Sequence, residues 1–304
     1  MSSSSISINW TPMIVGFVAG LISRLFSLKT GTTHYPGYPS GYISQLALAV
    51  IAAMIGSSVL IALIGKQFTA ATFLTLAATQ FRDVRNTERQ TLAQEEKLIL
   101  VSRGPGYIEG IAITYEARNY LAMLVALLTS AITMVGGLVI GVIGAVIVVI
   151  IGEIFMSGQH LGDIVDVEPA KIWFDKGSLL YVGDVMMMEV GLPHPRERYE
   201  KEGLGVVLTP KNERGQAVLW NISQRQAISY EAAAAVGVQK DVGYPEQTPL
   251  CRMAMPAGTG KAGLSILPVD HDMNKLIRAI KRTPVLESSK WNRMTSPVLN
   301  RKEM

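Results

Sequence analysis

The stretch from Asn119 to Gly152 reads NYLAMLVALLTSAITMVGGLVIGVIGAVIVVIIG and contains no charged residue. A straight helix of this length would extend for about 51 Å at about 1.5 Å per residue. The hydrocarbon core of a bilayer is only about 30 Å thick. Because Gly136-Gly137 divides the run near its middle, the sequence predicts an apolar helical hairpin over residues 119–156 or, alternatively, one long span.

Two more apolar segments precede this run, at residues 10–25 and 43–64. Trp10 suits a membrane interface, and Arg24 is expected to extend its guanidinium to the headgroups. The N-terminus lacks the basic residues of a cleaved signal peptide. Residues 1–66 therefore predict two membrane spans.

Basic residues are concentrated between these apolar regions. Residues 67–118 predict an amphipathic helix followed by a break at Gly104-Pro105, with Arg82, Arg85 and Arg89 on one helical face at the membrane surface. Loops rich in Lys and Arg are retained in the cytoplasm. This favours four spans with both termini inside. Three spans, with the C-terminal half outside the cell, are the alternative.

The C-terminal half is polar and predicts a soluble α+β domain over residues 157–287, followed by a polar tail over 288–304. Its strand-like segments are residues 171–174, 179–190, 205–208, 217–220, 250–255 and 263–269. One helix is predicted from a cap at Asn221 or Ser223 through Ala235, with its end at Gly237, and another from Met273 to Lys281 behind Asp270. The predicted fold class is a multi-pass α-helical membrane region followed by a soluble α+β domain.

Composition argues against several functional classes. The net charge is +4 and the pI about 9.1, but no dense basic stripe with interleaved aromatics indicates nucleic-acid binding. The single cysteine, Cys251, excludes an intrachain disulfide and a zinc-binding spacing. Acidic residues and one histidine follow the apolar run, but glycines interrupt their spacing, so no metal and no cofactor is predicted; these residues are Glu153, His160, Asp163, Asp166 and Glu168.

Glu109 and Glu116 are the candidate catalytic residues. They lie seven positions apart, so a helix would place both on one face. Two acids at a membrane surface suit acid–base chemistry or cation binding. The simpler interpretation is that they stabilise the helix N-terminus and pair with arginines such as Arg103, Arg118 or those of residues 82–89.

The six residues around Glu109 also carry a resemblance. Tyr107, Ile108, Glu109, Gly110, Ile111 and Ala112 spell YIEGIA. The flanking stretches FRDVRN (81–86), EARNY (116–120) and RTPVLE (282–287) extend the similarity over nearly the whole chain. The sequence therefore resembles the YIEGIA family, membrane proteins of endospore-forming Firmicutes.

The resemblance implies a cellular setting and no reaction. It implies a cell-membrane location, in the forespore or mother cell, and a small protein partner described as a capping-complex subunit. Together with the lipid bilayer, these are the expected partners, and an oligomer is compatible with the sequence. The first hypothesis is a scaffold that recruits a partner in sporulation or spore-envelope assembly. The second is a membrane-associated hydrolase or protease that uses Glu109.

Overall fold

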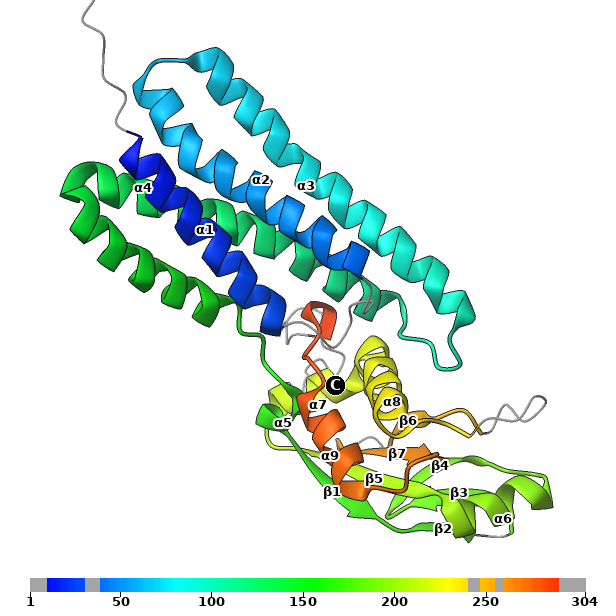
Figure 1. The fold of residues 1–304 in the computed structure, drawn as a ribbon. Coiled ribbons are helices and arrows are strands. Elements are labelled where there is room, and N and C mark those ends of the chain that lie inside the picture. The colour runs from blue at the N-terminus through cyan, green and yellow to red at the C-terminus, as the bar shows by residue number, and fades with distance from the viewer. Residues whose placement is uncertain (1–9, 31–38, 176, 240–246, 255–259, 290–304) are drawn as a thin grey trace, which may run out of the picture. The chain divides into compact units, whose positions relative to one another are not determined.

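The computed structural model describes residues 10–30, 39–175, 177–239, 247–254 and 260–289 (Figure 1). The chain divides into two compact units. The helical unit comprises Met1–Gln90 and Ile111–Ser157, and the α/β unit comprises Thr91–Gly110 and Gly158–Met304.

The helical unit is built from four helices, α1 (Thr11–Thr30), α2 (Pro39–Ile64), α3 (Phe68–Glu95) and α4 (Pro105–Met156). Helix α4 contains a kink at Gly137, where φ is 75° and ψ is −176°. A Cβ atom added to Gly152 would lie 2.9 Å from Leu121 Cδ1, and one added to Gly144 would lie 2.8 Å from Ile132 Cγ2. The part of α4 after the kink therefore folds back along the part before it, as the green ribbon shows (Figure 1).

Glycines allow α1 and α2 to approach the backbone of α4. A Cβ on Gly16 would lie 2.5 Å from the carbonyl oxygen of Ala126, and one on Gly56 would lie 2.1 Å from that of Met123. Gly20, one turn beyond Gly16, makes a similar approach. Small residues spaced four apart permit this close packing of apolar helices.

The predicted multi-pass membrane region is wrong. Among the described residues, only the stretches Tyr42–Ile64 and Pro105–Met156 are helices long and apolar enough to cross a membrane. The apolar helix Thr11–Ser27 is shorter than that requirement. The uncharged run over 119–152 lies within α4, whose two helical parts meet at the Gly137 kink and pack against each other, as in the predicted hairpin. The fold is a helical unit with two candidate spans and a sheet-containing domain.

The α/β unit contains two antiparallel sheets. The four-stranded sheet has the order β1-β5-β7-β6, and the three-stranded sheet has the order β2-β3-β4. The strands are β1 (Val165–Ala170), β2 (Ile172–Asp175), β3 (Leu179–Val182), β4 (Val185–Glu189), β5 (Leu204–Pro210), β6 (Leu250–Met253) and β7 (Ala262–Ile266).

Helices cover one face of the four-stranded sheet, and the three-stranded sheet covers the other (Figure 1). The helices of the unit are α5 (Leu161–Ile164), α6 (Pro193–Glu202), α7 (Glu213–Trp220), α8 (Ile222–Val236) and α9 (Met273–Arg282). Two short 3-10 turns, η2 (Glu96–Leu98) and η5 (Glu287–Ser289), belong to the same unit.

This layering produces two hydrophobic cores. Alternation along β5 directs Val206 and Leu208 toward the helices and Val207 toward the second sheet. Gly263 of β7 faces the second sheet, where an added Cβ would lie 2.7 Å from Met187 Sδ. The central strands are therefore covered on both faces.

Part of the predicted secondary structure is wrong. Residues 217–220, predicted as the second strand of a hairpin, lie in helix α7. The Asn212 side chain caps this helix by accepting a hydrogen bond from Gly215 N at 2.8 Å. An Asn cap followed by Glu213 in the first turn favours a helix over a hairpin turn.

Other local predictions had mixed outcomes. The Asn221 cap and the end of α8 at Gly237 are confirmed. The cap of α9 is Asp272 and not Asp270. Strand β1 and helix α6 were not predicted, since both contain prolines that obscure the pattern. Of the predicted tail, residues 290–304 lie outside the described residues.

Candidate functional site

The segment before α4 lies against α8. Glu96 accepts hydrogen bonds from Ser102 Oγ and, at 2.8 Å, from Gly104 N. Gly104 has a φ of 85°, and a Cβ there would lie 2.3 Å from Gln226 Oε1 of α8. Only glycine combines this backbone conformation with so close an approach. The chain then enters α4 at Pro105, a favoured first helical residue.

Tyr107 of the YIEGIA motif is buried against the same helix. Its hydroxyl donates a hydrogen bond to Glu231 Oε1, and its ring packs edge-on to Tyr230 with centroids 6.0 Å apart. The guanidinium carbon of Arg103 lies 5.2 Å from the centre of the Tyr230 ring, and Arg103 also pairs with Glu95 at 3.4 Å. We call Arg103, Tyr107, Tyr230 and Glu231 the motif cluster.

The motif cluster contains a carboxylic acid, Glu231, whose pKa is shifted by its surroundings. Burial raises the pKa of the Glu231 carboxyl above its ordinary value, although the Tyr107 hydrogen bond and the Arg103 charge act in the opposite direction. Arg103 Nε is buried and has no hydrogen-bond partner among the residues that the structure describes. Chemically, the cluster can hold or release one proton at the contact between the motif and α8.

The C-terminal segment reaches the start of α8. The buried side chain of Gln224 donates to the Pro284 carbonyl at 3.0 Å and accepts from Leu286 N at 2.9 Å. A Cβ on Gly110 would lie 3.6 Å from Leu286 Cδ2. Because α8 also contacts Tyr107, it joins the motif stretch to the RTPVLE stretch, which are distant in sequence.

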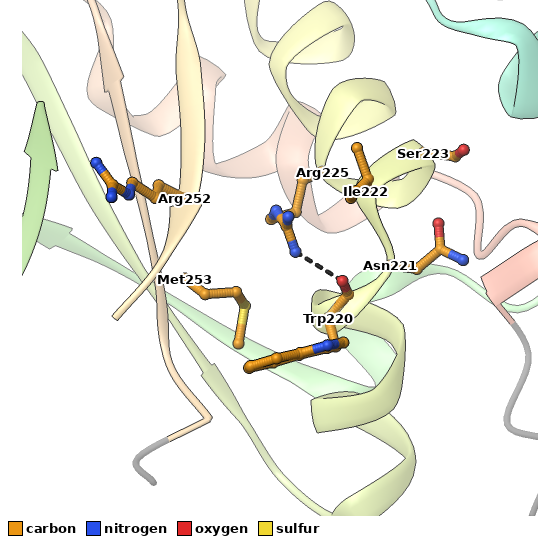
Figure 2. Close-up of a pocket in the computed structure, with 7 residues that line it drawn as sticks. All are labelled: Trp220, Asn221, Ile222, Ser223, Arg225, Arg252 and Met253. Carbon is orange, nitrogen blue, oxygen red and sulfur yellow. Dashed lines mark hydrogen bonds between the residues drawn. The ribbon is translucent and has the colours of Figure 1, made fainter. Parts of the chain in front are cut away.

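An open pocket of 610 Å³ lies beside the first turn of α8 (Figure 2). Arg225 crosses toward α7 and donates to the carbonyl oxygens of Leu219 at 2.9 Å and Trp220 at 2.7 Å. On the β6 side, Arg252 donates to the Met187 carbonyl at 2.6 Å. The pocket combines an indole, a thioether and two cations; its lining is Trp220, Asn221, Ile222, Ser223, Arg225, Arg252 and Met253.

Cys251 is a buried free thiol. It lies in β6 and belongs to the helix-side core. Burial raises the pKa of the Cys251 thiol to about 12, so the thiol is protonated at neutral pH.

The predicted site residues fall into different surroundings. Tyr107 and Ile108 are buried in the α/β unit, whereas Glu109 and Gly110 are half-buried there. Ile111 and Ala112 are also buried but belong to the helical unit. The structure thus divides the six-residue motif between two compact units.

The second candidate acid forms an ion pair. Glu116 accepts from Arg85 Nη1 at 3.1 Å, linking α4 to α3 within the helical unit. Arg82 and Arg89 of α3 are exposed. Glu109 and Glu116 belong to different units. Both acids lie in the first part of α4, and the arginine pairing considered for Glu116 is observed.

Sequence reasoning missed the partners of the motif. Glu231, Tyr230 and Gln226 recur on one side of α8, but a helix with polar residues on one side also fits a solvated surface. The prediction that Arg24 extends to the headgroups is wrong, because its side chain is 1% exposed. The burial of Arg24 could have been inferred from Gln45 and Asn119, because polar side chains within apolar helices require hydrogen-bond partners.

The acidic residues after α4 have structural contacts. His160 and Asp163 form a capping box at α5, and Asp166 pairs with Lys211 at 3.5 Å. Within the described ranges, no three His, Cys, Asp or Glu side chains are arranged to hold a metal ion.

Comparison with known proteins places these features in a family. The family described as "YIEGIA protein" matches residues 12–296. A protein of Bacillus subtilis (strain 168) described as "Uncharacterized protein YphB" is 44% identical over 278 residues, covering 91% of this chain and 93% of the relative. No solved structure matches the chain. With a match that includes the motif, α8 and the C-terminal segment, the chain belongs to the YIEGIA family.

Proposed function

We propose that this protein is a membrane-embedded scaffold that recruits a small protein partner during sporulation or spore-envelope assembly. The observation that carries the proposal is the exposure of α4 after its kink. There Val139 is 72% exposed, Ile154 is 67% exposed and Phe155 is 84% exposed. All three side chains belong to α4, whose most apolar window is only 6% buried.

The hydrocarbon of a lipid bilayer suits the exposed apolar surface of α4. A soluble protein rarely exposes a contiguous apolar patch of more than a few hundred Å². A helix satisfies its own backbone hydrogen bonds, so its apolar side chains can face hydrocarbon without leaving polar groups unpaired. The cell membrane is therefore the proposed location, and the family resemblance suggests a forespore or mother-cell membrane.

The pocket beside α8 is the proposed recruitment surface. Ile222 is 73% exposed, next to the half-buried Trp220 and the Arg225 and Arg252 guanidinium groups. An aromatic anchor flanked by arginine is typical of energetically important interface positions. Its positive charge suits a partner segment that combines acidic and apolar residues.

Membrane embedding is tested by extraction of the full-length protein at alkaline pH. We expect the protein to stay with the membrane pellet under carbonate conditions that release peripheral proteins. Release of the intact chain into the supernatant would contradict the proposal. The control is a peripheral protein of the same cells, which must be released in the same experiment.

The side on which the α/β unit lies is measured by thiol labelling. Because Cys251 is buried, it should label only after denaturation. The Glu197→Cys variant provides an exposed site, since the Glu197 side chain is 67% exposed. We expect labelling by an impermeant reagent only after permeabilisation, which would place the unit in the cytoplasm. Labelling in intact cells would place it outside.

Recruitment is tested with the Ile222→Arg variant in sporulating cells. We expect wild-type abundance, with loss of cross-linking to a small protein and a defective spore envelope. The matched control is Val269→Arg, because Val269 is a similarly exposed apolar residue at 63% that does not line the pocket. Wild-type cross-linking and envelope assembly in Ile222→Arg would reject the pocket as the recruitment surface.

The hydrolase hypothesis has its own test. A Glu109→Gln variant keeps the side-chain shape and removes the basic carboxylate. Loss of function at normal abundance and normal partner cross-linking would favour a reaction at Glu109. Loss of abundance or of cross-linking would indicate a structural role.

A further inference from the structure

The helical unit encloses an arginine. Arg24 of α1 is 1% exposed, and its Nε donates to Asn119 Oδ1 of α4 at 3.2 Å. Its Nη2 donates to Gln45 Oε1 of α2. Both acceptors are neutral amides, so the buried guanidinium donates hydrogen bonds to them without a neutralising charge at either contact. A buried cation without a counter-charge is costly.

Donor groups remain unsatisfied around this arginine. Arg24 Nη1 and Asn119 Nδ2 are buried and have no hydrogen-bond partner in the described part of the chain. The hydroxyl oxygen of the neighbouring residue Ser23 is buried without a partner as well. Guanidinium and amide nitrogens only donate hydrogen bonds, so the site requires an acceptor.

The surrounding charge has a positive sum. Arg118 and Glu153 interact electrostatically with Arg24. Glu153 accepts a hydrogen bond from Ser27 Oγ at 2.9 Å, which fixes the carboxylate on α1. Two guanidinium groups and one carboxylate leave one positive charge in excess. This charge repels a metal cation and attracts an anion.

We propose that Arg24 and Asn119 bind a small inorganic anion of the halide class inside the helical unit. A water molecule would accept hydrogen bonds but would leave the charge uncompensated. The burial of Arg24 favours a single small ion over a lipid phosphate group. This site goes beyond the proposed scaffold function and does not depend on the recruitment pocket.

The test uses the full-length protein in detergent. Thermal unfolding is measured in sodium chloride and in sodium gluconate at equal ionic strength, with chloride titrated against gluconate. A ligand that binds only the folded state raises the melting temperature in a saturable way. We expect a saturable rise of roughly 3 to 8 °C with chloride, and a similar rise with bromide.

Two variants identify the site. Asn119→Asp places a carboxylate beside Arg24 at the same position, so this variant should be stable in gluconate and show no specific response to chloride. Arg24→Gln should also lose the response, and if it fails to fold, Asn119→Asp still decides the question. General salt effects on the protein act on both wild type and Asn119→Asp and therefore cancel in their difference.

Several outcomes would overturn the proposal. One is an equal chloride response in wild type and Asn119→Asp, which would place the anion effect elsewhere. Another is the absence of any chloride response in wild type, which would show that the unsatisfied donors need no anion. Stabilisation by lipids with a phosphate headgroup, but not by chloride or bromide, would assign the site to lipid and reject a small inorganic ion.

Discussion

The two units differ in the side chains that they expose to their surroundings. In the helical unit, Val139 and Phe155 are exposed while Arg24 is enclosed. In the α/β unit, Leu264 is fully buried and Lys201 is largely exposed. The α/β unit follows the pattern of a protein in water. The helical unit has the arrangement expected where the outer surface contacts hydrocarbon and ionisable side chains face the interior of the bundle.

The units also differ in how their elements approach one another. In the helical unit, glycines of α1 and α2 approach backbone carbonyl oxygens of α4, the close packing typical of apolar helices with small residues at their contacts. In the α/β unit, two cores of large apolar side chains separate the layers. Matched substitutions in the two units test this difference in packing by their effects on stability and on membrane association.

The largest effect is expected for Gly56→Leu in α2. A Cβ at this position would lie 2.1 Å from the Met123 carbonyl oxygen, and backbone atoms cannot move aside. We expect destabilisation of more than about 3 kcal/mol and loss of folded protein, measured by thermal unfolding and abundance. Gly158→Leu is the control in the α/β unit, because a Cβ there meets nothing within 4 Å.

The second prediction compares one substitution at two exposed valines. Val146 of the helical unit is 55% exposed, and Val269 of the α/β unit is 63% exposed. Val146→Asp should remove the protein from the membrane fraction, because a carboxylate near the centre of a bilayer costs about 2.5–3.5 kcal/mol. Val269→Asp should leave stability within about 0.5 kcal/mol. Equal tolerance at both positions would place both surfaces in water.

The smallest effect is expected at Glu231. Because burial raises the folded-state pKa of this carboxyl above its ordinary value of 4.5, the folded state binds the proton more tightly. Its contribution to stability is therefore present at low pH and is lost as the pH rises from about the ordinary value through the raised one.

Glu231→Gln should remove that pH dependence, because the amide stays neutral and its oxygen still accepts from Tyr107. We expect the melting temperature of the variant to change less than that of wild type between acidic and neutral pH, by a few degrees. Glu197→Gln, at an exposed site, is the control. Identical pH profiles for wild type and Glu231→Gln would contradict the assigned burial of this carboxyl.

Local signals in the sequence predicted several elements well. Asn221 and Gly237 bound α8 because capping chemistry acts over a few residues. The stretch predicted as strand-like over 179–190 contains β3 and β4, but the turn at Gly183, where φ is 59°, that divides them was not predicted. Residues 217–220 were misassigned because a short apolar stretch fits a strand and a helix equally well.

Partners distant in sequence were not predictable in this way. Tyr107 and Glu231 are separated by 124 positions, and Arg24 and Asn119 by 95. No pattern within its own segment indicates the partner of any of these residues. Their meaning depends on which helices pack together, and that is decided by close approaches such as Gly56 to Met123.

The sequence by itself determined the uncharged run of 119–152, the polar C-terminal half and the family motif, because composition and short motifs are properties of neighbouring residues. Only the tertiary structure decided that Tyr107 docks on α8 and that Arg24 is enclosed. The physical reason is that burial and hydrogen-bond partners are set by packing between segments, which no single segment encodes.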